Sequence, residues 1–139
     1  MWLYNEKEFT EENIESFISF VYCITNLENN RKYIGKKTFY FTRTKIINNK
    51  RKKIKIFSDW QTYYGSNKIL QEEISINGIH NYKREILHLC KTKSEASYLE
   101  LKEQMNNSVL ESNDYYNEYI IVKINKKHLG SLYGQINTL

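Results

Sequence analysis

The chain has 139 residues, of which 27% are charged and 40% hydrophobic, as expected for one globular domain with a real core. It contains no apolar run long enough to cross a membrane and no basic-then-apolar signal at its start, so we expect a protein of the cytoplasm. The net charge of +5 is concentrated in residues 31–55, where Lys and Arg alternate with aromatic residues. This segment suits a phosphate backbone, although lysines that only keep a hairpin soluble remain the alternative.

The first half of the chain reads as one short helix followed by two β-hairpins. Apolar residues at helical spacing predict a helix over 10–19 with Thr10 as its N-cap. Residues 20–25 and 32–35 predict two strands joined by the Asn-rich turn 26–30. Residues 38–57 predict a second hairpin, whose basic tip would span 48–53.

The second half predicts two helices separated by a strand. We expect a loop over 58–67, a helix over 67–77 that ends at Gly78, and a strand over 82–90. Thr92 and Glu95 form a capping box for a helix over 92–107, and residues 114–124 predict a last extended segment. The fold class is therefore α+β. A small, mostly antiparallel sheet of about three core strands is flanked by helices and carries an added basic β-hairpin, all in one domain over 1–139 with a core at about 18–124 and a tail at 125–139.

Cysteines and histidines give no metal-binding pattern. Cys23 and Cys90 stand alone in predicted strands, which favours free thiols over a disulfide. The three histidines are scattered and no Cys-x-x-Cys pair exists, so zinc is not expected.

The stretch "VYCITNLENNRKYIG" resembles the GIY-YIG nuclease superfamily. The second family tripeptide is intact as Tyr33-Ile34-Gly35, and the first keeps only its tyrosine, in Phe20-Val21-Tyr22. The two tyrosines are eleven residues apart, as in the family. Four further landmarks follow in the family's order: Arg43, then "SDWQTYYGSN", then Glu100 within "SEASYLELKEQ", and then Asn117. This ordered series covers about 18–124 and is far more specific than either tripeptide.

The resemblance implies a metal-dependent DNA endonuclease, phage-encoded or of the homing type. The implied catalytic residues are Tyr22, Tyr33, Arg43, Glu100 and Asn117. Glu100 would bind Mg²⁺ or Mn²⁺, Arg43 the scissile phosphate, and the tyrosines the attacking water. Because a phenol has a pKa of about 10, we expect Lys36 and Lys37 to supply the positive field that a tyrosine needs near neutral pH.

Several other residues are candidates for DNA contacts or for support of the site. Gly35 is expected to be structural, since only a small residue lets another backbone or a phosphate approach closely. Ser66 and Lys68, at the start of a helix, suit a phosphate. The DNA-binding candidates are Lys36, Lys37, Arg51, Lys52, Lys53, Ser66 and Lys68.

Two departures from the family leave alternatives open. The family's arginine usually lies on a helix, whereas Arg43 lies in a predicted hairpin, so Arg51 is a second candidate. No histidine lies between residues 34 and 79, which leaves Tyr64 as the nearest substitute. The degenerate first tripeptide also allows a catalytically inactive nucleic-acid-binding protein on the same scaffold, or less readily a protein-interaction module. Specificity would be low, built into the hairpin and tail, or gained by formation of a homo-oligomer.

Overall fold

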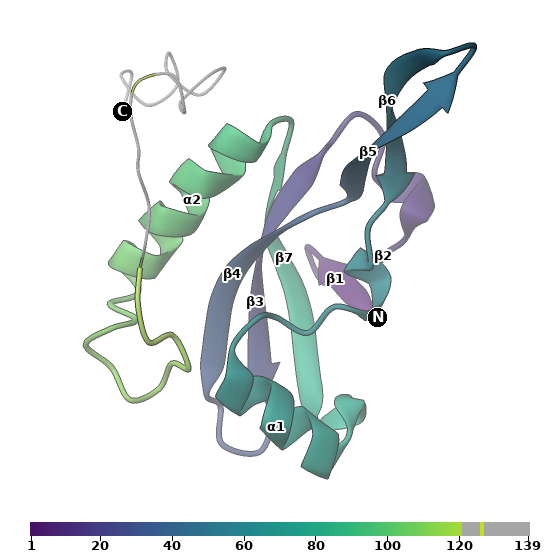
Figure 1. Ribbon diagram of the computed structural model, residues 1–139. Helices are drawn as coiled ribbons and strands as arrows, with labels where there is room; N and C mark the ends of the chain where they lie inside the picture. Colours follow the sequence, from purple (N-terminus) through teal and green to yellow (C-terminus); the bar gives the residue numbers. More distant parts are fainter. Residues whose placement is uncertain (121–125, 127–139) are drawn as a thin grey trace.

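The computed structural model describes residues 1–120 and Lys126, and this part of the chain is an α+β fold as predicted (Figure 1). Its main sheet has the strand order β2-β1-β7-β3-β4. All neighbouring strands are antiparallel except β1 and β7, which are parallel. The strands are β1 (Trp2–Tyr4), β2 (Lys7–Phe9), β3 (Ser19–Asn26), β4 (Lys32–Thr38) and β7 (Tyr82–Cys90).

The sheet is wider than the sequence analysis expected. The three longer strands β7, β3 and β4 correspond to the predicted core, but β1 and β2 extend the sheet to five strands. Each of the two added strands has three residues, which is too short to show a recognisable alternation of apolar and polar side chains. Trp2 and Phe9 anchor this addition in the core, since both are buried.

Both faces of β3 are buried, which explains its nearly continuous apolar sequence. One face carries Phe20, Tyr22 and Ile24, which pack in a core cluster with Leu70 of helix α1 (Lys68–Asn77). The opposite face carries Val21 and Cys23, which pack in a cluster with Ala96 of helix α2 (Lys93–Asn106). The sheet thus separates the two helices, and β4 forms one of its edges.

Both predicted helices in the second half of the chain are present, and each begins with a capping side chain, of which only Thr92 was expected. The Asn67 side chain accepts a hydrogen bond from the Leu70 backbone N–H, and the Thr92 side chain accepts one from the Glu95 backbone N–H. Gly78 ends α1 with a φ of 85°, a conformation that glycine adopts without strain. Cys23 and Cys90 are free and buried, as expected.

The predicted helix over 10–19 is wrong. A single 3-10 turn spans Glu11–Asn13, and Ser19 already begins β3. The Asn13 side chain accepts a hydrogen bond from the Thr10 backbone N–H, which closes a local turn, and Glu15 has a φ of 49° that no α-helix contains. Ile14 is buried in the core cluster without any helix around it.

The extended segment predicted over 114–124 forms only a single β-bridge in the described residues. Tyr115 pairs in parallel with Lys32 at the edge of β4, and residues 116–120 form no strand. Residues 121–124 and the expected tail, apart from Lys126, lie outside the described residues. In the described part of the chain no helix is long and apolar enough to cross a membrane.

The basic hairpin consists of β5 (Tyr40–Ile47) and β6 (Lys50–Phe57) and forms a separate two-stranded sheet. Its turn is Asn48–Asn49, with φ values of 52° and 62°, so the turn is shorter than the predicted tip over 48–53. Residues 50–53 pair within the ladder instead. The hairpin projects from the body of the protein as an arm (Figure 1).

Candidate active site

The two family tyrosines lie on the same face of the β3-β4 pair. Tyr22 is directly opposite Gly35, and Tyr33 is opposite Ile24. The ring of Tyr22 covers Gly35, where a Cβ atom would lie 2.7 Å from the Tyr22 Cζ atom. Gly35 is therefore required by an aromatic side chain of its own fold, whereas the sequence analysis expected a backbone or a phosphate there.

A pocket of about 300 Å³ opens beside the outer edge of β4. Its walls come from β4, from the residues at the start of α1, from α2 and from the segment that follows Asn117. It is lined by Tyr33, Ser66, Asn67, Lys68, Glu100, Gln104, Asn117, Glu118, Tyr119 and Ile120. Five of the sequence-predicted site residues therefore meet here: Tyr33, Ser66, Lys68, Glu100 and Asn117.

Glu100 is the carboxylate on the α2 wall of this pocket. Burial raises the pKa of Glu100, and the nearby Lys36 charge and backbone amide partly oppose that rise. Burial thus favours the neutral carboxyl, whereas a cation bound in the pocket would favour the ionised carboxylate. A half-buried carboxylate in a polar pocket is an arrangement typical of a functional group.

Tyr33 presents its hydroxyl to the pocket, where it lies 3.0 Å from the Ser66 Oγ atom. Tyr22 does not line the pocket. It is 1% exposed, and its ring lies 6.2 Å from the ring of Tyr33 and 5.9 Å from that of Tyr63. Tyr22 therefore supports Tyr33 from inside the protein.

The pKa values of both tyrosines move upward. Burial raises the pKa of Tyr22 well above its usual value, and the hydroxyl of Tyr63 adds to this effect. Burial is also the largest cause of the raised pKa of Tyr33. The expectation that Lys36 and Lys37 would supply a pKa-lowering field is therefore wrong, and both phenols are neutral near pH 7.

The two lysines leave opposite faces of β4 and bind different partners. The Lys36 Nζ atom donates to the Ser97 Oγ atom on α2 at 2.6 Å. The Lys37 Nζ atom forms an ion pair with Asp59 at 2.6 Å and lies 4.0 Å from the centre of the Tyr63 ring. Lys37 thereby lowers the pKa of Asp59 and holds Tyr63 beside Tyr22.

The backbone of Ile34, in the middle of the intact tripeptide, is held by two side-chain amides. Asn117 accepts a hydrogen bond from the Ile34 N–H at 3.1 Å and donates to its carbonyl oxygen at 2.8 Å. Gln104 donates to the same carbonyl at 3.1 Å. Both amides fix the edge strand between Tyr33 and Gly35, so Asn117 acts here as a positioning residue.

Three contributors to the site were missed by sequence reasoning. Gln104 lies one turn after Glu100 on α2, and that spacing could have indicated it. It is 6% exposed, and its Oε1 atom has no partner among the described residues. Tyr63 and Glu118 carried no signal of their own, because their places depend on how two irregular segments fold.

The arginine candidates do not line the pocket. Arg43 and Arg51 are exposed on the projecting hairpin, as are Lys52 and Lys53. Tyr64, the suggested substitute for histidine, packs instead against Arg84, whose guanidinium lies 4.1 Å from the centre of the Tyr64 ring. Among the residues that line the pocket, Lys68 carries the basic side chain.

The pocket offers oxygen ligands rather than a cluster of metal-binding residues. The described residues contain no group of three or more His, Cys, Asp and Glu that could hold a metal ion. Glu100 is accompanied by Glu118, by amide oxygens and by the Tyr33 and Ser66 hydroxyls. Oxygen donors with few carboxylates fit Mg²⁺, which keeps most of its own water molecules.

Comparisons with known proteins identify the family of the chain. Residues 2–120 match the family model described as the GIY-YIG domain of the putative endonuclease segE. The chain is also 36% identical over 98 residues to the putative endonuclease segE of Enterobacteria phage T4. This match covers 70% of the chain but 39% of the relative, so the chain spans about two fifths of that protein's length. No solved structure matches the chain. The chain therefore belongs to the GIY-YIG family of segE-type domains.

Proposed function

From this family membership and from the pocket, we propose that the protein is a divalent-metal-dependent endonuclease that hydrolyses phosphodiester bonds in DNA. The observation that carries the proposal is the half-buried Glu100, which shares one pocket with Tyr33 and Lys68. Its phage relative supports an origin in a phage or similar mobile element. A mixed pocket with a carboxylate, a phenol and an ammonium group can serve a metal, a water and a phosphate together.

Glu100 would hold the metal, Mg²⁺ or Mn²⁺, with help from oxygen atoms of the same pocket. When bound, such an ion neutralises charge on the phosphoryl oxygens and activates a water molecule. Gln104 also lines this pocket, and its Oε1 atom, which has no partner among the described residues, is a further acceptor. An acceptor left without a partner in the interior is costly, which favours some further group at this position.

Tyr33 would orient the attacking water, and Lys68 would contact the scissile phosphate. Because burial raises the pKa of Tyr33, its hydroxyl acts as a neutral donor and acceptor rather than as a phenolate. Ser66, 3.0 Å away, fixes the direction of that hydroxyl. Lys68 begins α1 and supplies positive charge from the pocket wall, where charge develops in the transition state.

Tyr22 and Asn117 would act through the residues that they position. Tyr22 packs beneath Tyr33 and over Gly35, while Asn117 holds the Ile34 backbone from the other side. Arg43 lies outside this pocket, so we assign it to DNA binding together with the other cations of the hairpin. Lys36 would tune Glu100, since its charge lowers the pKa that burial raises.

A plasmid-cleavage assay tests the proposal. Wild-type protein is incubated with supercoiled plasmid in Mg²⁺ or in EDTA, beside Glu100→Gln and the matched control Glu103→Gln. Glu103 is a carboxylate on the same helix that pairs with His88 at 2.7 Å, away from the pocket lining. We expect Mg²⁺-dependent nicking or linearisation that Glu100→Gln reduces by about 10³-fold and Glu103→Gln retains.

The opposite outcome has a definite meaning. If wild-type protein binds DNA but never cleaves it with Mg²⁺ or Mn²⁺, the chain is an inactive nucleic-acid-binding relative. Cleavage that is unchanged in Glu100→Gln would move the metal site away from this pocket.

A further inference from the structure

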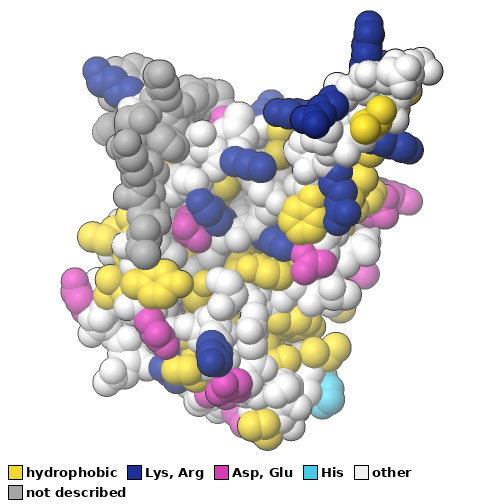
Figure 2. Space-filling model, viewed as in Figure 1, with side chains coloured by type: hydrophobic (Ala, Val, Ile, Leu, Met, Phe, Trp, Pro, Cys, Tyr) yellow, Lys and Arg dark blue, Asp and Glu magenta, His cyan; other side chains and the backbone are white. Residues whose placement is uncertain are grey.

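The β5-β6 hairpin carries a concentrated excess of positive charge. It contains seven cationic residues and no acidic one: Arg43, Lys45, Lys50, Arg51, Lys52, Lys53 and Lys55. Because the whole chain has a net charge of +5, the rest of the chain has a net charge of −2. In the space-filling view, Lys and Arg side chains stand out along the projecting arm (Figure 2). The hairpin is thus a basic arm on a slightly acidic body.

Both faces of the hairpin are basic. Opposite residues of an antiparallel pair share a face, so the register places Arg51, Lys53 and Lys55 on one face. The same register places Arg43, Lys45, Lys50 and Lys52 on the other face. A ribbon that lay flat on a row of phosphates would need cations on one face only.

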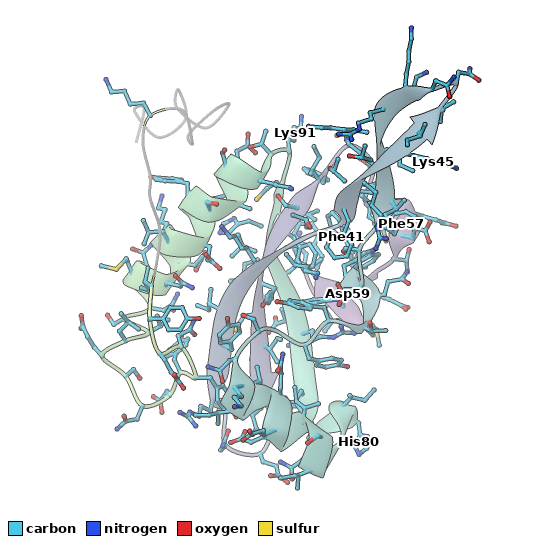
Figure 3. The ribbon with its side chains drawn as sticks, viewed as in Figure 1. Phe41, Lys45, Phe57, Asp59, His80 and Lys91 are labelled. Carbon is cyan, nitrogen blue, oxygen red and sulfur yellow. The ribbon has the colours of Figure 1, made fainter. Side chains whose placement is uncertain are left out.

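The arrangement has no structural benefit within the hairpin. Lys45 is directly opposite Lys52, and like charges at opposite positions destabilise a strand pair. None of the seven cations forms an ion pair with any described acidic residue. Figure 3 shows Lys45 on the outer part of the arm, and Phe41 and Phe57 at its base. An external polyanion would relieve this repulsion.

The base of the arm is fixed to the body, whereas its outer part is exposed on both sides. Phe39, directly before β5, is buried in the core cluster, and its N–H donates to the Ile18 carbonyl oxygen at 2.8 Å. Beyond this base, residues 42–53 are all exposed. Near the turn, Ile46 is 71% exposed, which places an apolar side chain at the outer end of the arm.

We propose that the hairpin is a two-stranded ribbon that enters the major groove of duplex DNA, with each basic face toward one wall of phosphates. With side chains, such a ribbon is roughly 10 Å thick, and the major groove is about 12 Å wide. Ile46 near the turn would meet base edges, where a thymine methyl group offers an apolar contact. The proposal rests on the proposed nuclease function for its choice of DNA.

Other nucleic-acid surfaces fit the ribbon less well. The minor groove of B-form DNA is about 6 Å wide, too narrow for a two-stranded ribbon. The major groove of an RNA duplex is deep and narrow, and a single strand offers no pair of phosphate walls. Duplex DNA is therefore the substrate class that this arm selects.

Two matched variants test the two-faced geometry. One is Arg51→Gln/Lys53→Gln/Lys55→Gln, and the other is Arg43→Gln/Lys45→Gln/Lys52→Gln, so each loses three charges from one face. Binding to a short fluorescent DNA duplex is measured by anisotropy in EDTA over a range of salt concentrations. We expect both variants to bind at least about tenfold more weakly, with the salt slope smaller by about 2 to 3 in each.

A shortened hairpin controls for folding and for substrate preference. Phe41 pairs with Ile56, so deletion of residues 42–47 and 50–55 leaves the base closed by the Asn48–Asn49 turn and removes all seven cations. Wild-type protein is expected to prefer duplex DNA over single-stranded DNA and duplex RNA by about tenfold, and the shortened variant to lose this preference. Methylation interference is expected at guanine N7 in the major groove, not at adenine N3 in the minor groove.

The outcomes separate this inference from the proposed catalysis. Loss of binding in one triple variant alone would mean that the arm lies flat on the backbone, and unchanged binding in both would place DNA elsewhere. Interference at adenine N3 would assign the minor groove. All of these measurements are made without metal, so a failure of Glu100 as metal ligand leaves them unaffected, and a failure of the arm leaves the plasmid assay unaffected.

Discussion

Strand β4 and the arm carry positive charge in different ways. On β4, the Lys36 ammonium group is held by Ser97 and that of Lys37 by Asp59, so both groups have fixed directions and known partners. On the arm, Lys45 stands opposite Lys52, and neither pairs with any described acidic residue. Positive groups with fixed directions can stabilise the negative charge that develops in a transition state, whereas unpaired exposed cations attract an extended polyanion. We infer that chemistry and DNA binding occupy separate parts of this small domain.

The first prediction replaces one cation in the pocket and one on the arm. Lys68→Gln should lower the single-turnover cleavage rate at saturating enzyme by about 10²-fold, because it removes one donor to the scissile phosphate. Arg43→Gln removes the same charge from the arm and should weaken DNA binding a few-fold while the saturated rate is unchanged. Rapid quenching gives the rate, and anisotropy in EDTA gives the affinity.

The reverse pattern of effects would contradict this assignment of Lys68 to catalysis and Arg43 to DNA binding. If Arg43→Gln lowers the saturated rate about tenfold or more and Lys68→Gln does not, the scissile phosphate is held by the arm. The hairpin would then have to fold over the pocket in the DNA complex. The catalytic arginine that the family resemblance implied would be restored at residue 43.

A second prediction concerns the packing beneath the pocket, which the arm lacks. Gly35→Ala should lower the free energy of unfolding by about 1 to 3 kcal/mol, because the new methyl group overlaps the ring of Tyr22. Urea unfolding measures the change. In a Tyr22→Ala background the same substitution should cost much less, and a penalty that persists there would mean that Gly35 is needed for its backbone alone.

The sequence predicted the local elements well and the longer-range placements less well. Thr92 and Gly78 mark helix ends through bonds to near neighbours, so short-range signals were sufficient. The helix expected over 10–19 failed because Ile14 is buried by distant strands rather than by a helical face. Tertiary packing therefore overrode a weak periodic pattern there.

The same difference between local and long-range signals separates the site residues that were predicted from those that were missed. Tyr33 and Glu100 were found by order along the chain, and the fold does bring them to one pocket. Gln104 and Tyr63 were missed because their contacts cross between elements far apart in sequence. Arg43 was chosen by spacing alone, but its segment folds as an arm and not as the helix on which the family carries its arginine. Spacing predicts position only where the intervening structure is the same.

The last prediction concerns the cost of burying the charged Glu100 carboxylate in the pocket, a cost that the exposed arm does not have. Burial raises the pKa of Glu100, so the neutral carboxyl is favoured in the folded protein. That stabilisation is fully present below the unfolded pKa, about 4, and is lost as pH rises through the higher folded pKa. Glu100→Gln stays neutral and should exceed wild type in unfolding free energy at pH 7 by about 1 kcal/mol or less.

The gain should disappear as the pH approaches 3.5, where wild-type Glu100 is also neutral. Urea unfolding across this range, with the exposed pocket residue Glu118→Gln as control, measures it. A Glu100→Gln variant that is less stable than wild type at pH 7 would show that Lys36 outweighs burial. If Glu100→Gln is more stable than wild type but inactive, the charged carboxylate lowers the stability of the fold and is needed for function. Such a trade-off between stability and activity is common at functional sites. The arm accepts the same kind of trade-off through the repulsion between Lys45 and Lys52, and we propose that bound DNA relieves it there.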